Sequence, residues 1–146
     1  MVAEKGLARE LGVGVVVFEF NAGHLPPPKE LARLIDVLQT APRPILLHCR
    51  NGVDRAGMAS AVAALVVGKV GLDQALAQLP RLRANGGSVH VSDVFGQYRA
   101  YCREKGADAD DPATFKKWVA DVYHGQPQPQ TQLVPRIPFW PGKDGE

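Results

Sequence analysis

The stretch from Ala56 to Val67 constrains the fold of this chain more than any other segment. Its composition favours a helix, and its side chains are apolar on nearly every side of that helix. A helix that is apolar all round is stable in water only when other elements cover it. We therefore predict a buried helix here, with other elements packed against it.

Two apolar segments upstream of this helix are predicted to be strands. Gly12–Phe20 is rich in β-branched and aromatic residues, which is typical of a buried strand in a parallel sheet. The prolines Pro26–Pro28 require a loop, Lys29–Gln39 has apolar residues at helical spacing, and Ile45–His48 is a second short apolar run. This order predicts an α/β fold, in which helices flank a parallel sheet with a right-handed crossover.

The second half of the chain is predicted to be helical. Leucines at helical spacing indicate a helix over Asp73–Arg83, and Ser92 is a suitable N-cap for a helix that runs to about Lys105. Asp111-Pro112 is a typical N-cap and first-turn pair, which predicts a last helix over Ala113–Tyr123. The Pro- and Gln-rich residues 125–146 are expected to form an extended tail.

Two strands alone do not make a stable sheet. Three explanations stay open: further strands exist that the pattern does not reveal, the chain starts part-way into its natural domain, or a second chain, as in a homodimer, completes the sheet. In the last two cases the sheet within this chain is incomplete.

Composition excludes several classes of protein. The chain has 146 residues, 45% of them hydrophobic and 22% charged, as in one ordinary globular domain. Its formal net charge of +2 is too small to indicate nucleic acid or an acidic membrane surface as a partner. No apolar run is long enough to span a membrane.

The cysteines and the first residues indicate a reducing compartment. Glu4 and Lys5 interrupt the region where a signal peptide would be apolar, so we expect a cytoplasmic location. Cys49 and Cys102 are too few and too far apart for a disulfide framework. The single adjacent pair His48-Cys49 has no matching second pair, so no metal site is expected.

The motif His48-Cys49-x5-Arg55 lies between the second predicted strand and the buried helix. A loop that opens a helix points backbone N–H groups inward and forms a nest for a tetrahedral oxyanion. Gly52 permits backbone geometry that a side chain would obstruct. The N–H groups and Arg55 favour the thiolate of Cys49, which can attack phosphorus in line, while the planar fork of Arg55 suits two phosphoryl oxygens.

The stretch from His48 to Gly57 (HCRNGVDRAG) resembles the HC-x2-G-x2-R-[ST]-G loop of the cysteine-based protein-tyrosine and dual-specificity phosphatase superfamily. Compatible elements extend the resemblance over residues 7–123. It implies a phosphatase-like catalytic domain over residues 1–124, followed by the tail. The Asp54-Arg55 pair is more similar to bacterial and phosphoinositide-directed members than to receptor-type enzymes.

The resemblance also implies a mechanism without a cofactor. Cys49 would form a thiophosphate with a phosphorylated protein or a small phosphomonoester, and water would then hydrolyse it. Arg55 would bind phosphate and stabilise the transition state, and His48 would support the loop through a hydrogen bond. The residues implied to line the phosphate site are Arg50, Asn51, Gly52, Val53, Asp54 and Arg55.

The chain departs from the family pattern at two catalytic positions. Ala56 stands where the family has Ser or Thr, whose hydroxyl helps the thiolate to leave, so we predict slow hydrolysis of the thiophosphate. The family's general acid is an Asp on an upstream loop, where this chain has none. Glu19 is closest to the expected position, with Asn21 and His24 in the adjoining loop, and Asp54 is an equal candidate.

Other functions stay open at this point. Arg50 either attracts an anionic substrate or is simply solvated. The same loop could serve a rhodanese-type sulfurtransferase or a thiol arsenate reductase, although the latter needs resolving thiols and only Cys102 is available. A third alternative is a phosphate-recognising module whose catalysis has weakened, which Ala56 favours and the intact Cys49 and Arg55 oppose.

Overall fold

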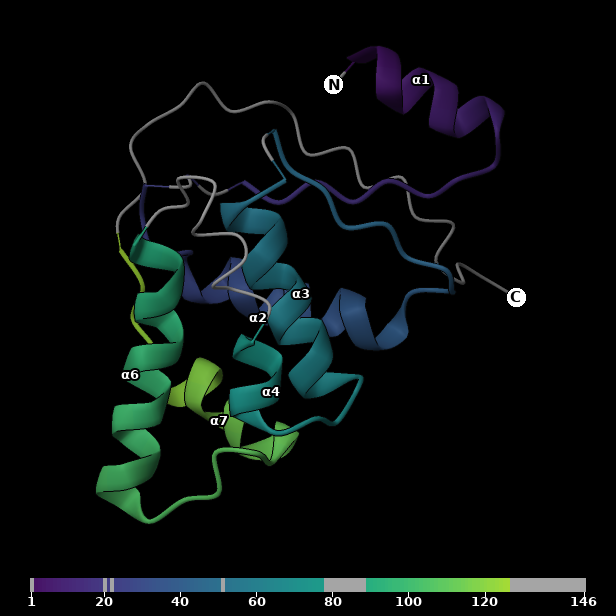
Figure 1. Cartoon of the computed structure of the whole chain (residues 1–146). Helices are drawn as coiled ribbons and strands as arrows, with labels where there is room; N and C mark the ends of the chain where they lie inside the picture. The colour runs from purple at the N-terminus through teal and green to yellow at the C-terminus, as the bar shows by residue number, and fades with distance from the viewer. Residues whose placement is uncertain (1, 20, 22, 51, 78–88, 127–146) are drawn as a thin grey trace. The chain divides into compact units, whose positions relative to one another are not determined.

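The structure is a computed structural model that describes residues 2–19, 21, 23–50, 52–77 and 89–126. The chain divides into two compact units: a terminal unit of residues 1–19 and 130–146, and a main unit of residues 20–129. The regular elements of the described residues are α-helices (Figure 1). They are α1 (Val2–Glu10), α2 (Pro28–Thr40), α3 (Asp54–Val66), α4 (Leu72–Leu76), α6 (Val89–Lys105) and α7 (Pro112–Asp121).

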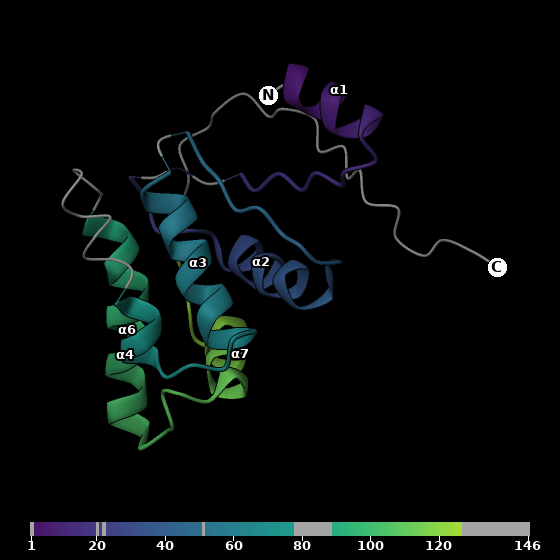
Figure 2. The same cartoon turned by 45° about the vertical axis from the view of Figure 1, so that its right-hand side comes forward.

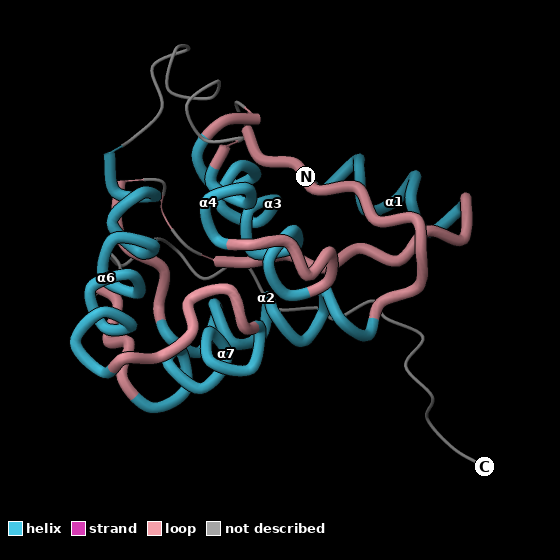
Figure 3. Tube along the Cα trace, turned by 60° about the horizontal axis from the view of Figure 1, so that its bottom comes forward, coloured by secondary structure: helices cyan, strands magenta, loops and turns pink. Residues whose placement is uncertain are grey.

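The prediction of a parallel sheet is wrong for the described part of the chain. Residues 12–19 and 45–48 form no strand there, apart from an isolated bridge at Val15, and Figure 3 draws both segments as loop. Their β-branched and aliphatic residues favour extended backbone, but a strand also needs a neighbour to pair with its backbone N–H and C=O groups. The two segments belong to different units, and Leu46 leaves 84% of its surface exposed.

The predicted buried helix is confirmed as α3. This helix packs against α2, α4, α6 and α7, so the main unit is built around it (Figures 1 and 2). Ala61, Val62 and Leu65 are fully buried. Because α3 is covered on several sides, its N-terminal end is held in place by much of the core.

The stripe predicted for α2 is also confirmed. Its aliphatic side chains at helical spacing are buried, namely Leu31, Leu34, Ile35 and Leu38. Pro28 occupies the first turn of the helix, where its missing N–H costs nothing. The charged Glu30 in the same turn is only 3% exposed, and its carboxylate lies 3.5 Å from the guanidinium of Arg33.

Aromatic side chains form the core between α6 and α7. The rings of Tyr98 and Phe115 meet edge to face with centroids 4.9 Å apart. The ring centroid of Trp118 lies 5.3 Å from that of Tyr98. The Tyr98 hydroxyl donates to the carbonyl of Ala109 at 3.2 Å, and burial raises the pKa of this phenol. Tyr123, beyond the end of α7, continues the cluster with its ring centroid 5.0 Å from that of Trp118.

The predicted helix ends are partly confirmed. Asp111 caps α7 as expected, because its carboxylate accepts from the N–H groups of Ala113 at 3.1 Å and Thr114 at 3.0 Å. Ser92 is not an N-cap, since α6 begins three residues earlier at Val89. The helix predicted over 73–83 is described only as α4, because residues 78–83 lie outside the described residues.

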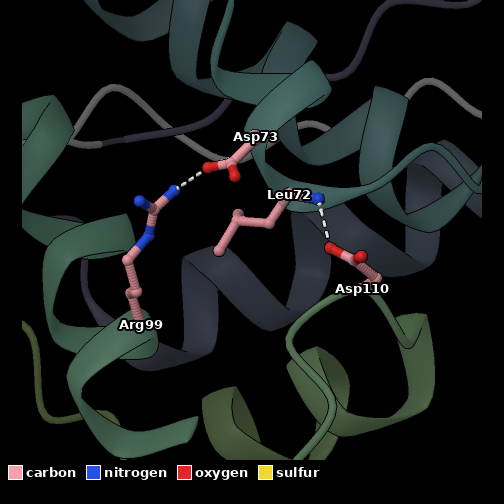
Figure 4. Close-up of polar contacts among 4 residues, drawn as sticks. All are labelled: Leu72, Asp73, Arg99 and Asp110. Atoms are coloured by element: carbon pink, nitrogen blue, oxygen red, sulfur yellow. Dashed lines mark hydrogen bonds and ion pairs between the residues drawn. The ribbon is translucent and has the colours of Figure 1, made fainter. Parts of the chain in front are cut away.

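Contacts from distant parts of the chain hold α4 in place (Figure 4). The carboxylate of Asp110 accepts from the backbone N–H of Leu72 at 2.7 Å, thirty-eight residues away in sequence. Arg99 of α6 forms an ion pair with Asp73. The first turn of α4 is therefore fixed by α6 and by the loop before α7.

Candidate active site

Residues 48–50, 52 and 53 lead into α3, and Asp54 and Arg55 are the first two residues of that helix. Cys49 is half-buried, whereas His48 and Arg50 are exposed. Gly52 has a φ of +67°, in the left-handed region that glycine adopts without strain. A Cβ at Gly52 would meet nothing within 4 Å, so the backbone angle rather than lack of space requires glycine here.

The N-terminal end of α3 has no side-chain cap. Val53 stands at the cap position and its side chain offers no acceptor, while the first turn closes with the N–H of Gly57 on the carbonyl of Val53 at 2.9 Å. Helix N-termini carry partial positive charge and N–H groups that favour anions. The loop that contains Cys49 therefore ends at a helix terminus suited to a negatively charged ligand.

Arg55, the second residue of α3, contributes a buried donor to this end. Its Nε atom is buried and has no hydrogen-bond partner among the described residues. A buried donor without a partner costs about 1–3 kcal/mol, and more when the group is charged. A bound oxyanion would supply the acceptor that Arg55 lacks.

The two candidate proton donors occupy different places. Asp54 is the first residue of α3 and lies directly beside Arg55 in sequence. Glu19 is half-buried and belongs to the terminal unit, whereas the Cys49 loop belongs to the main unit. Asn51, which was predicted to line the phosphate site, lies outside the described residues.

Ala56 is 8% exposed, so the position that carries a hydroxyl in the family pattern is buried in this chain and apolar.

Among the described residues, no group of three or more His, Cys, Asp or Glu side chains could hold a metal ion. No helix in this described part is both long and apolar enough to cross a membrane. The site consists of a thiol, a guanidinium and a helix terminus.

The segment that enters α2 holds residues whose roles the sequence did not reveal. His24 has a buried Nδ1 atom without a hydrogen-bond partner among the described residues. The Tyr123 hydroxyl donates to the carbonyl of Pro26 at 2.8 Å, and the N–H of Leu25 donates to the Gln126 side-chain oxygen at 3.0 Å. These pairs are about a hundred residues apart, so no local pattern could have predicted them.

The start of α3 suits a tetrahedral oxyanion, because the Val53 side chain makes no cap hydrogen bond and the Nε atom of Arg55 is buried without a partner among the described residues. Residues 20–74 match the family model described as the tyrosine phosphatase family. This confirms the resemblance to the protein-tyrosine phosphatase superfamily and supports a phosphatase function in general terms. The matched span starts where the main unit starts and ends within α4. Comparison with curated proteins and with solved structures gave no significant match.

Proposed function

We propose that this protein hydrolyses phosphomonoesters through a cysteinyl-phosphate intermediate, as a phosphatase of protein-tyrosine or dual-specificity type. The observation that carries this proposal is the segment from Cys49 to Arg55, which joins a half-buried thiol to the start of α3, where the Nε atom of Arg55 is buried without a partner among the described residues. The tyrosine phosphatase match over residues 20–74 contains this segment and the helix.

The proposed reaction has two steps. In the first, the Cys49 thiolate attacks phosphorus, a sulfur–phosphorus bond forms, and the bond to the ester oxygen breaks while that oxygen takes a proton. Arg55 and the N–H groups at the start of α3 offset charge on the phosphoryl oxygens. In the second step, water attacks phosphorus and gives a proton to the group that lost one in the first step, the sulfur–phosphorus bond breaks, and inorganic phosphate and the thiolate are released.

Asp54 is the proposed donor of the proton to the ester oxygen. It lies in the same unit as Cys49, within the matched span, and at the helix terminus where the phosphate would bind. Glu19 lies one residue before the matched span, whereas Asp54 lies inside it, which favours Asp54. A positioned general acid contributes roughly 10²- to 10⁴-fold to the rate.

The test is phosphate release from p-nitrophenyl phosphate under reducing conditions. The leaving phenolate is stable, so the assay does not depend on the proton donor. We expect Cys49→Ser to abolish turnover, because a serine hydroxyl is a far weaker nucleophile than a thiolate. Cys102→Ser is the matched control, since Cys102 is buried in the core at 4% exposure and is expected to keep turnover. Equal turnover in Cys49→Ser and wild type would refute the covalent mechanism.

A phosphate-binding module without efficient catalysis is the second candidate. The buried Ala56 favours it, because no hydroxyl at this position can help the thiolate to leave. The two functions differ in one measurement. A phosphatase releases phosphate from p-nitrophenyl phosphate, whereas a binding module binds inorganic phosphate but releases no phosphate from this ester, either as wild type or as Cys49→Ser.

A further inference from the structure

The chain between α2 and α3 contains a short apolar segment, residues 45–47, whose backbone is unpaired. The N–H and C=O groups of these three residues make no hydrogen bond within the described part of the chain. Leu46 leaves 84% of its surface exposed, more than any other large hydrophobic side chain that the structure describes. An apolar segment with unpaired backbone groups is a template for pairing with another strand, so it is a candidate docking surface.

The exposure of the side chains alternates along this part of the chain. Those at positions 46, 48 and 50 are exposed, and those at positions 45, 47 and 49 are half-buried. Alternation with a period of two is typical of an extended chain, whose successive side chains point to opposite sides. Figures 1 and 2 show the chain between α2 and α3 as a long trace without a helical turn. An extended peptide that lies along residues 45–47 can therefore pair with their backbone groups.

The charges around the segment favour a negatively charged occupant. Residues 37–53 include two arginines and one histidine but no Asp or Glu. If two copies of the chain paired antiparallel about the peptide bond after Leu46, Arg43 of one copy would lie opposite Arg50 of the other. Like charges directly opposite each other destabilise a strand pair, which disfavours a second copy as the occupant. A phosphorylated peptide brings negative charge instead, and is attracted to the same side chains.

The segment leads directly to the proposed nucleophile. Cys49 follows Leu47 by two residues, which corresponds to about 7 Å along an extended chain. A peptide that pairs with residues 45–47 therefore needs to continue for only about two residues to bring a phosphorylated side chain level with the thiol. The docking surface and the site at the start of α3 are continuous along the chain.

We propose that residues 45–47 are the docking surface for a phosphorylated polypeptide substrate, which binds as an added β-strand. Main-chain hydrogen bonds supply affinity that does not depend on the peptide sequence, Leu46 contacts an apolar side chain of the peptide, and Arg50 attracts acidic residues near the phosphorylated one. This inference rests on the proposed function, because the docked peptide is the substrate of Cys49. It gives the protein a reason to prefer phosphorylated polypeptides to small phosphomonoesters.

The first test needs no variant of the protein. A short acidic phosphotyrosine peptide is compared with two derivatives, each N-methylated on one of its two sets of alternate backbone N–H groups. Alternate N–H groups of a strand point to opposite sides, so only one set can face residues 45–47. We expect one derivative to lose about tenfold in kcat/KM and the other to match the parent peptide. Equal values for the two derivatives would overturn the backbone pairing.

The second test compares Leu46→Glu with wild type on the parent peptide and on p-nitrophenyl phosphate. Both substrates carry a phosphate, so the ratio of their kcat/KM values removes the effect of the new charge on the phosphate site. We expect Leu46→Glu to lower this peptide-to-ester ratio about tenfold, because it removes the apolar contact and repels the acidic peptide. Leu11→Glu is the matched control, since Leu11 is 69% exposed in the terminal unit, and its ratio should equal that of wild type.

The outcomes separate this inference from the proposed function. Turnover of p-nitrophenyl phosphate with an unchanged ratio in Leu46→Glu overturns the docking surface and leaves the proposed function intact. Absence of turnover of both substrates by wild type overturns the proposed function, and the docking surface with it. A dimer of the full chain in sedimentation that Leu46→Glu dissociates would show that a second copy, and not a peptide, occupies residues 45–47.

Discussion

The N-terminal ends of α3 and α7 solve the same physical problem in different ways. Each leaves backbone N–H groups without a partner inside its helix and each carries partial positive charge. In α7 the carboxylate of Asp111 accepts from Ala113, Thr114 and the Thr114 hydroxyl. In α3 the cap position is held by Val53, whose side chain makes no cap hydrogen bond.

The difference separates a structural helix end from one suited to a ligand. At α7 the chain provides its own anion, and the hydrogen bond from Ala113 lowers the pKa of the Asp111 carboxyl. At α3 the proposed anion is the phosphate of the substrate. The hydrogen bonds at the start of α7 stabilise the fold. At the start of α3, the proposed hydrogen bonds to an anion would instead contribute to binding.

The largest effect on activity is expected from substitution of Arg55, since the start of α7 has no corresponding arginine. Arg55→Lys keeps the positive charge but loses the planar fork, so we expect kcat/KM for p-nitrophenyl phosphate to fall by about 10²- to 10³-fold. Arg99→Lys, in a surface ion pair of the same unit, is the matched control and should keep activity. Equal activity of the two variants would mean that the α3 terminus does not bind phosphate through a guanidinium.

The next effect concerns the carboxylates. We expect Asp54→Asn to lower turnover of an alkyl phosphate by about a hundredfold and of p-nitrophenyl phosphate by only about threefold, because a poor leaving group needs the proton more. Glu19→Gln is expected to leave both rates unchanged. If the loss that depends on the leaving group occurs in Glu19→Gln instead, Glu19 is the donor and Asp54 is not.

A smaller effect is expected at Ala56. If the thiophosphate is hydrolysed slowly, wild type shows a rapid burst of p-nitrophenol followed by a slow phase. Ala56→Ser restores a hydroxyl at the start of α3, and we expect it to raise the slow phase about tenfold and to diminish the burst. Rapid-mixing kinetics with p-nitrophenyl phosphate measure both phases. Absence of a burst in both proteins would contradict a slow second step.

No effect on activity is expected from a change at the start of α7. Asp111→Ala removes the cap and is expected to lower the melting temperature by about 3 °C while turnover stays at the wild-type level. Asp36→Ala, an exposed Asp on α2, is the control for loss of a surface charge. A loss of turnover in Asp111→Ala at a temperature where it is folded would show that the two helix ends are not independent.

The same variant has a characteristic pH dependence. The hydrogen bonds hold the pKa of Asp111 below its ordinary value of 3.8, so the folded state favours the ionised carboxylate. The stabilisation is therefore present above pH 3.8 and is lost as pH falls through the lowered pKa. The difference in melting temperature between wild type and Asp111→Ala should narrow at pH values below 3.8 and be constant near neutrality.

The features that could be predicted from sequence are those encoded within a few residues. The Asp111 cap, the buried character of α3 and the Cys49 loop each depend on neighbours in sequence, and each was predicted correctly or matches a known family. The prediction that Ser92 caps its helix was wrong, because a residue that suits a cap can also lie inside a longer helix. The prediction of a sheet was wrong because β-propensity describes a single segment, whereas a strand forms only when a second segment pairs with it.

The parts of the site that could not be predicted depend on contacts between distant residues. The last helix was predicted to run to Tyr123, but α7 ends at Asp121, and beyond it Val122 is 38% exposed while Tyr123 is buried. The bond from Tyr123 to Pro26 and the unpartnered nitrogen of His24 appear only once residues far apart in sequence are brought together.

The bonds from Tyr123 and Gln126 to residues 25 and 26 have a consequence for synthesis of the protein. A growing chain presents Cys49 more than seventy residues before Tyr123 is added, and the segment of His24 is not secured until that later residue arrives. Domains generally fold as units, and the N-terminal ones fold first during synthesis. These two bonds can form only after Tyr123 and Gln126 have left the ribosome, so the backbone of residues 25 and 26 is secured late in synthesis.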